Sequence, residues 1–278
     1  MIIKPKYTQT IAVAILGIIT ALTLVVLVYI VVFVLSKGLP VISWDFLSLP
    51  PAEMGRSGGI FPMVVGSIIL PLLAIAIAFP FGLGTAIYLT EYTTENRFTS
   101  TIRFGVDCLG GVPSIIFGLF GFIFFVTQLR LGWSLISGAL TLAIMVLPTL
   151  IRTSEEAIKA VPYSYREVSI SLGASKWGTV FKIVLPNALP GILTGVMLSI
   201  GRALGETAAV IFTAGICPSI PSSLFDSVRT MSVHFYILAR EGISDKNAYG
   251  TATVLIIAVL LVNLVSYQIM YRFVARRR

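Results

Sequence analysis

The stretch Ile11–Leu35, IAVAILGIITALTLVVLVYIVVFVL, carries no charged side chain and decides the class of fold. A helix of about 20 apolar residues crosses the hydrocarbon core of a bilayer, which is about 30 Å thick. The stretch is too long for the apolar core of a signal peptide, about 7–15 residues, and no small-residue cleavage pattern follows it. It therefore predicts a retained transmembrane helix.

The rest of the chain has the same character. Further apolar runs are Met63–Thr90, Phe104–Thr127, Ser134–Ile151, Leu189–Ala214 and Thr251–Tyr271. Hydrophobic residues make up 56% of the chain and charged residues 12%, which leaves too few polar side chains to cover a soluble core. Because lipid offers no partner for open strand edges, we expect an all-α polytopic protein with six transmembrane helices, forming one domain over residues 1–278.

Basic residues between the predicted spans indicate the orientation. Most of them fall on one side of the membrane: Lys4, Lys6, Arg97, Arg103, Arg152, Lys159, Arg166, Lys176, Lys182, Arg272 and Arg276–Arg278. The positive-inside rule places that side, and both termini, in the cytoplasm of a cell with this protein in its plasma (inner) membrane. The net charge of +8 is thus a topology signal, and no basic soluble face predicts nucleic-acid binding.

Motifs for independent catalysis are missing from the sequence. It has no glycine-rich phosphate loop, no serine-hydrolase or zinc-protease motif, and no cluster of histidine and cysteine that predicts a metal. We therefore expect a chain that is not itself an enzyme and carries no cofactor or metal. In the external loop 215–250, Thr230–Glu241 is expected to form a short interfacial helix, with the single histidine, His234, solvated or interfacial.

The internal segment 152–188 is amphipathic rather than uniformly apolar. Val161 and Pro162 break one helix, and Gly173 ends or bends the next before Pro186. Such a pair of short helices needs a surface for its apolar face. That surface is either the ends of the protein's own helices or a cytoplasmic partner.

Spacing within this segment resembles a known family motif. Glu167, Gly173, Ile183, Leu185 and Pro186 stand at the positions of Glu, Gly, Ile, Leu and Pro in the EAA loop of bacterial ABC-importer permeases, with Val168 and Ser169 at its two alanines. The resemblance implies the type I ABC-importer permease fold. It also implies that these residues belong to a coupling loop that seats on an ATPase subunit.

Other stretches resemble phosphate-importer permeases of the PstA type: Gly59–Pro62, Ala86–Tyr92, Gly111–Ile115, Gly118–Gly121, Glu155–Ala157, Pro190–Gly195 and Gly201–Ala208. The resemblance implies a channel that carries inorganic phosphate into the cytoplasm. It further implies a sister permease (PstC type), two ATPase subunits (PstB type) that use ATP and Mg²⁺, and an extracytoplasmic phosphate-binding protein (PstS type), all at a lipid membrane.

Charged residues in the fifth span are the candidates for substrate contact. Arg202 lies inside the span, where a charge is costly, and Glu206 follows at i+4, which on a continuous helix places both on one face. Either the two residues form an internal ion pair that only neutralises itself, or the guanidinium of Arg202 is aimed into the translocation path and Glu206 holds its orientation. Arg152, at the cytoplasmic end of the fourth span, is either an interfacial anchor or a second anion contact.

Two alternatives to a phosphate permease remain at this stage. The same architecture could carry another oxyanion, such as molybdate or sulfate. A self-sufficient ion channel or ion-coupled transporter belongs to a different class, and it would not need the EAA spacing.

Overall fold

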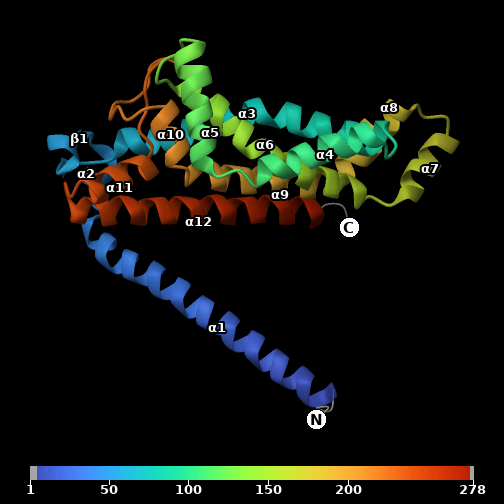
Figure 1. Cartoon of the computed structure of the whole chain (residues 1–278), viewed down its shortest axis with the longest axis horizontal. Coiled ribbons are helices and arrows are strands. Elements are labelled where there is room, and N and C mark those ends of the chain that lie inside the picture. The colour runs from blue at the N-terminus through green and yellow to red at the C-terminus, as the bar shows by residue number, and fades with distance from the viewer. Residues whose placement is uncertain (1–4, 276–278) are drawn as a thin grey trace.

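The computed structural model describes residues 5–275 and is built almost entirely from helices (Figure 1). Lys4 and Arg276–Arg278, which contribute to the predicted charge asymmetry, lie outside the described residues. Five of the described helices are long and apolar enough to cross a membrane, and a bent helix pair makes a sixth if it counts as one span. The expectation of an all-α polytopic protein is confirmed.

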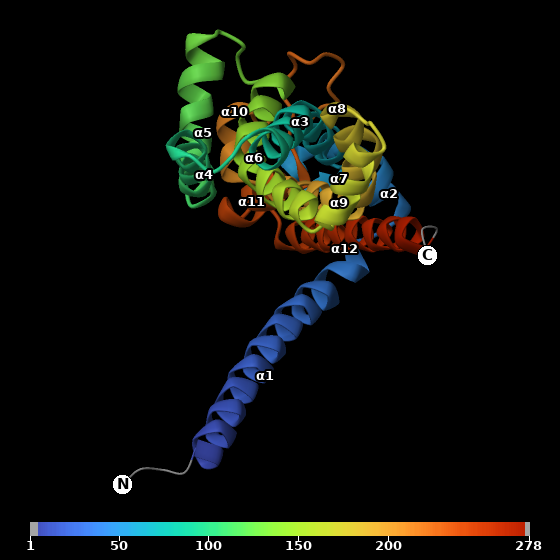
Figure 2. The same ribbon diagram turned by 90° about the vertical axis from the view of Figure 1, so that its right-hand side faces the viewer.

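The first span is a single long helix that stands apart from the rest. α1 (Pro5–Gly38) leaves the bundle at an angle, seen from the side in Figure 1 and from the end in Figure 2. It contacts the body only near its C-terminal end, where Phe33 packs edge-on against Tyr249 and Val34 O accepts from Thr253 Oγ1 at 3.3 Å. None of its most apolar window is buried, so lipid or another chain must cover it.

The third predicted span is not one straight helix. α4 (Arg97–Gly110) and α5 (Ser114–Gly121), which continues as the π-helix η4 (Phe122–Gln128), are bent by 99°. Pro113 has the extended dihedrals φ −58° and ψ 141°, and proline disfavours helical geometry in the residue before it. Gly118 packs so closely on α10 that an added Cβ would lie 2.9 Å from Ala209 Cα. Gly118 and Gly121 thus serve close packing, and the segment around Pro113 breaks the helix.

The fourth span extends further toward its C-terminal side than predicted. α6 (Leu135–Lys159) carries Arg152 and the next turns of the segment that we expected to be loop. The true connection consists of α7 (Tyr163–Ser171), α8 (Lys176–Thr179) and the π-helix η5 (Val180–Val184), after which α9 (Leu185–Leu204) begins. α6 ends three residues before Pro162, which prevents the helix from continuing, since proline lacks the amide proton and restricts the residue before it.

The fifth predicted span is also interrupted. α9 ends at Leu204, residues 205–207 are not helical, and α10 (Ala208–Thr213) resumes for less than two turns. Gly205 is the C-cap of α9. A glycine at a helix end lets the chain depart from the helix at low steric cost.

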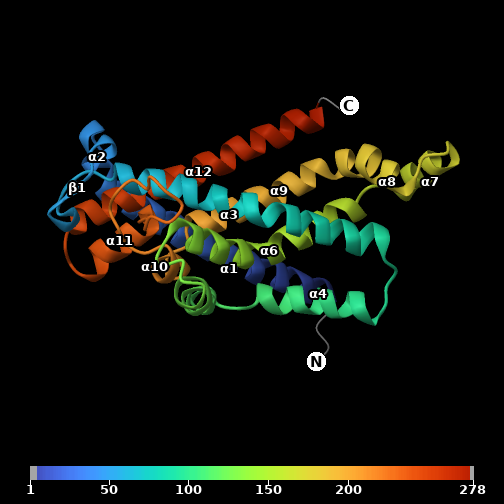
Figure 3. The same cartoon turned by 90° about the horizontal axis from the view of Figure 1, so that it is seen from above.

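Short elements gather at the end of the bundle opposite α7 and α8 (Figure 3). They are η1 (Leu39–Val41), α2 (Trp44–Ser48), the antiparallel pair β1 (Pro51–Ala52) and β2 (Ser57–Gly58), η2 (Glu53–Gly55) and α11 (Met231–Arg240). The helix expected at Thr230–Glu241 is therefore confirmed, with Thr230 as its N-cap. α12 (Asp245–Ala275) then returns along the bundle.

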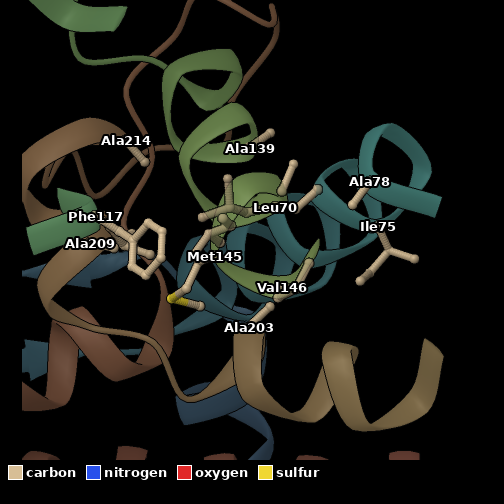
Figure 4. Close-up of a cluster of buried hydrophobic side chains, with 14 of the residues drawn as sticks. Leu70, Ile75, Ala78, Phe117, Ala139, Met145, Val146, Ala203, Ala209 and Ala214 are labelled. Atoms are coloured by element: carbon tan, nitrogen blue, oxygen red, sulfur yellow. The ribbon is translucent and has the colours of Figure 1, made fainter. Parts of the chain in front are cut away.

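The core lies between α3 (Phe61–Ile87), α6, α9 and α10 (Figure 4). Leu70, Met145 and Val146 fill it beside the small side chains Ala139 and Ala203. Two-thirds of the most apolar window of α6 is buried, 67% against 39% for α3, so α6 is the central helix. Small residues bring helices close enough in lipid for dispersion contacts to hold them together.

Candidate functional site

Arg202 lies in the last turn of α9, directly before the break in the fifth span. Its side chain is exposed, and it makes no ion pair with any acidic residue in the part of the chain that the structure describes. A guanidinium that faced lipid at this point would be costly. The exposure therefore indicates a face that is covered by water or by another chain.

Glu206 does not pair with Arg202, so the alternative of an internal ion pair is wrong, and Glu206 does not hold the orientation of the guanidinium. The prediction assumed a continuous helix, but α9 ends two residues before Glu206. Its Oε1 instead accepts from the amides of Thr207 and Ala209, both at 3.2 Å, at the start of α10. Its carbonyl accepts from Ser232 Oγ of α11 at 2.7 Å. Glu206 thus stabilises the break, where a negative charge suits the positive end of a helix.

Arg152 is held differently from Arg202. It forms an ion pair with Asp107 of α4, and both side chains remain partly exposed, 39% and 55%. Its neighbour Arg103 binds Glu155 of α6, with Nε 2.8 Å from Oε1. Lys159 reaches the same oxygen at 2.7 Å, and Arg103 also lies 3.3 Å from Glu95. A network of charges therefore joins α4 to the C-terminal part of α6.

The segment that resembles an EAA loop presents apolar side chains outward. Val168, Ile170 and Leu172 on and just after α7 are 59%, 56% and 83% exposed, and Glu167 is exposed beside them. On the inner side, Ser169 Oγ and Thr179 Oγ1 share a buried hydrogen bond of 2.8 Å that joins α7 to α8. An exposed apolar face at the tip of an otherwise polar loop is typical of a protein contact.

Gly173 forms the corner of this loop. Its φ of +85° is in the left-handed region, and a Cβ there would meet no atom within 4 Å. Glycine is thus required by backbone conformation rather than by space. Beyond the corner, Ile183 and Leu185 are half-buried and Pro186 lies in the first turn of α9, with Leu185 packed on a cluster that includes Ile158 and Val184.

Sequence patterns missed a further contact in this region, between Arg166 of α7 and Glu91 at the end of the second span. The two residues are far apart in sequence, so no local spacing signals the pair. Glu91 belongs to the stretch Ala86–Tyr92, which resembles the family, and Arg166 directly precedes Glu167 of the EAA-like spacing. That is the one signal that would have singled them out.

The prediction for His234 is wrong, because its side chain is only 1% exposed. It packs under the hairpin of the opposite end, where an added Cβ on Gly55 would lie 2.8 Å from His234 Cε1. Burial and the charge of Arg229, whose Nη1 lies 3.4 Å from Nδ1, lower the pKa of His234 to about 4. The ring is therefore neutral at physiological pH.

Comparison with known proteins identifies the architecture. Residues 78–278 match the family described as binding-protein-dependent transport system inner membrane component. The chain belongs to this family. Its membership confirms the resemblance that the sequence patterns indicated, since the matched region includes the EAA-like loop, Arg202 and Glu206.

Individual relatives cover nearly the whole of this membrane component. It is 32% identical over 275 residues to the probable ABC transporter permease protein YqgI of Bacillus subtilis, covering 93% of this chain and 94% of that protein. It is 38% identical over 225 residues to phosphate transport system permease protein PstA 1 of Mycobacterium tuberculosis, covering 80% of this chain and 73% of that one.

A solved structure supports the fold of the membrane component. A chain of a bacterial alginate ABC transporter in complex with an alginate-bound periplasmic protein superimposes with a TM-score of 0.65 at 16% identity. The match covers 95% of this chain and 96% of that one. At this identity the likeness shows the fold alone, and the fold is that of an ABC-importer permease.

Proposed function

We propose that this chain is a permease subunit of an ATP-driven importer and that it carries inorganic phosphate into the cytoplasm. Relatives named as phosphate transport permeases support the choice of substrate, including one that is 35% identical across 92% of this chain. Another oxyanion finds no comparable support.

The observation that carries the proposal is the unpaired Arg202 at the break of the fifth span. Glu206 is turned into the first turn of α10, so the guanidinium keeps its donors for a ligand. A planar guanidinium fork matches two oxygens of a tetrahedral oxyanion at once. The guanidinium also lies at the C-terminal end of α9, where the last backbone carbonyls favour a cation. These carbonyls stabilise the positive charge while no substrate is bound.

Arg152 lies on α6 at the cytoplasmic side and provides the exit contact in this scheme. Its partner Asp107 neutralises it when no substrate is present. A passing phosphate would compete with the carboxylate for the same guanidinium. The proposed path therefore runs from Arg202 to Arg152. Arg202 binds the anion more strongly because no acid among residues 5–275 competes for it.

The chain needs partners for this activity. We propose that the outward apolar face of α7, with Glu167 and the corner at Gly173, docks on an ATPase subunit that uses ATP and Mg²⁺. Two such subunits, a sister permease and an extracytoplasmic phosphate-binding protein complete the importer. This assignment places α7, α8 and both termini in the cytoplasm, and the first turn of α1 and the last turn of α12 point toward that end (Figure 1).

The proposal is tested with the assembled complex in proteoliposomes. With ATP inside and phosphate-loaded binding protein outside, we expect uptake of radioactive phosphate against its gradient. Sulfate and molybdate in tenfold excess are expected to leave the uptake unchanged. The chain alone, reconstituted at the same density, is the control. Uphill uptake by the chain alone, or preferred uptake of sulfate, would contradict the proposal.

A further inference from the structure

Arg166 on α7 and Glu91 form the most completely hydrogen-bonded ion pair in the described part of the chain. Arg166 Nη2 lies 2.6 Å from Glu91 Oε1, and Nε lies 3.0 Å and 3.3 Å from Oε1 and Oε2. Only 12% and 9% of the two side chains are exposed. A fork of this kind fixes orientation as well as distance, because two parallel N–H groups address one carboxylate.

Arg166 also binds the end of a third helix. Its Nη1 donates to Val161 O at 2.8 Å and its Nη2 to Ile158 O at 3.0 Å. Both carbonyls belong to the last turn of α6 and the residues just after it. The last carbonyls of a helix have no partner within the helix, so a guanidinium there satisfies them. One side chain thus ties α7 to the end of α6 and to Glu91.

Glu91 lies in the π-helix η3 (Tyr88–Tyr92), which continues α3 without a break. α3 packs along α6 in the core and carries buried residues over its whole length, from Pro62 to Ile87. A displacement of Glu91 is therefore a displacement of the inner end of α3. The covalent paths from α7 lead back to α6 through residues 160–162 and onward through the corner at Gly173 and η5 into α9, but neither leads to α3.

Close packing does not provide the connection between α7 and η3. A cavity of about 530 Å³ lies between them, lined by Thr90 and Glu91 on one side and by Tyr163, Arg166 and Ile170 on the other. A second polar contact spans the same gap, because Lys176 Nζ of α8 lies 5.3 Å above the ring of Tyr92. α7 thus reaches the second span through charged and polar side chains, whereas Val180 and Val184 of η5 pack with Ala86 and Ile87 of α3 in an apolar cluster.

We propose that the Arg166–Glu91 pair transmits movement of the coupling loop to α3. The inference rests on the proposed function, and both residues are positioning residues that touch neither substrate nor nucleotide. Glu167, the next residue along α7, is exposed and available to a partner, while Arg166 is turned inward. When the ATPase moves α7, the pair moves the inner ends of α3 and α6 together with it.

The first test separates transport from ATP hydrolysis. In Glu91→Gln, the carboxylate charge is lost while the shape is kept, and Arg166 retains its two carbonyl bonds. We expect the assembled complex to keep hydrolysing ATP while the phosphate imported per ATP falls at least about tenfold. The matched control is Glu95→Gln, four positions along the chain, whose side chain is 89% exposed and is expected to leave this ratio unchanged. A purely structural pair would lower assembly, hydrolysis and transport together.

A cross-link provides the second test and does not depend on the stability of Glu91→Gln. Cys108 and Cys217, both free and exposed, are first replaced by serine. Glu91→Cys and Arg166→Cys are then introduced, and the assembled complex is assayed before and after treatment with a short bismaleimide. We expect the cross-link to raise phosphate imported per ATP at least about fivefold, since it restores the connection without the charges.

The outcomes distinguish the two claims. If the wild-type complex imports phosphate and Glu91→Gln keeps the wild-type ratio, the proposed link is wrong while the proposed function stands. The same holds if the cross-linked cysteine pair remains as uncoupled as the open one. If the wild-type complex hydrolyses ATP but imports no phosphate, the proposed function is wrong, and the link to phosphate transport is overturned with it.

Discussion

Arg166 and Arg202 are the same residue type in opposite environments. Arg166 is nearly buried and donates to a carboxylate and two backbone carbonyls, whereas Arg202 is exposed and has no acidic partner among the described residues. Separating the members of a buried ion pair leaves each charge without compensation, so breaking the contact between Arg166 and Glu91 costs much free energy. Arg202 is already free. The difference separates an arginine that connects helices from one that can bind a ligand.

The difference arises from helix continuity. Glu206 lies only four residues after Arg202, and on an unbroken helix the two side chains would form an ion pair. The break after Leu204 instead turns Glu206 toward the amides of Thr207 and Ala209. Arg166 finds its acid on a different span, where a folded core fixes the position of Glu91. Local proximity in the sequence is thus a poor guide to pairing at a helix break.

Substitution of Arg202 is expected to have the largest effect. A hydrogen bond to a charged group contributes about 1.5–3 kcal/mol, which corresponds to roughly tenfold to a hundredfold in binding. Arg202→Gln should therefore lower phosphate uptake by the assembled complex at least about tenfold, with membrane level and ATP hydrolysis maintained. Arg202→Lys should recover little, because an ammonium lacks the bidentate fork. Uptake, membrane level and co-purification of partners are measured on each variant.

Glu206→Gln is the matched control for Arg202. The amide oxygen of glutamine can still accept from Thr207 and Ala209, so we expect uptake within about threefold of wild type, in line with an effect below about 1 kcal/mol. If Glu206→Gln abolishes uptake as fully as Arg202→Gln, the two residues act as a unit. The claim that Arg202 acts without an acidic partner, unlike Arg166, would then be wrong.

His234 is a buried titratable residue that is neutral at physiological pH, unlike the buried charged pair of Arg166 and Glu91. Its pKa of about 4 lies below the usual 6.5, so the unfolded chain binds more protons than the folded one between these values. Stability is fully present above pH 6.5 and falls as the pH approaches 4, by about 3 kcal/mol in total. We expect the melting temperature of the purified protein, followed by tryptophan fluorescence, to decrease between pH 7 and pH 4.5.

The control for this prediction is His234→Gln, which removes the titrating group. Its melting temperature is expected to depend less on pH over the same window, whatever its value at pH 7. Asp226, whose pKa is lowered from 3.8 by hydrogen bonds from Ser222 and Ser223, loses its contribution only below the window. An equal pH dependence in wild type and His234→Gln would show that His234 is not the group responsible.

Gly173 offers the smallest of the expected effects, at the corner of the loop that holds Arg166. A residue with a side chain pays about 1–2 kcal/mol in left-handed backbone geometry, which Gly173 adopts. In Gly173→Ala the free loop therefore relaxes to another conformation. Docking on the ATPase must then force the backbone back into the left-handed turn. We expect the affinity for the ATPase subunit to fall roughly fivefold to thirtyfold, measured by titration of the detergent-solubilised complex.

Gly84→Ala is the matched control for Gly173. It lies within α3 with no atom within 4 Å of the added Cβ and no left-handed backbone. Alanine is the better helix former there, so no loss of affinity is expected. A loss as large as that of Gly173→Ala would indicate that any added methyl group disturbs the complex, and the argument from φ would be wrong.

The sequence by itself determined the class of the molecule. Apolar runs such as Ile11–Leu35 specify membrane helices because a bilayer accepts few other structures, and that constraint acts on each segment separately. The EAA-like spacing, including Gly173, was equally visible because it lies in one short segment. Its requirement for a left-handed glycine is a local property of the backbone.

Only the tertiary structure decided which charges meet. Glu91 joins Arg166 and Asp107 joins Arg152 across different helices, and His234 is buried by a hairpin far from it in sequence. Pro113 and Gly205 permit the breaks before Ser114 and after Leu204 locally, but the 99° bend between α4 and α5 depends on what α5 packs against. Periodicity records which side of a helix is apolar, but the helix that covers that side, and the charge that faces it, follow from long-range packing.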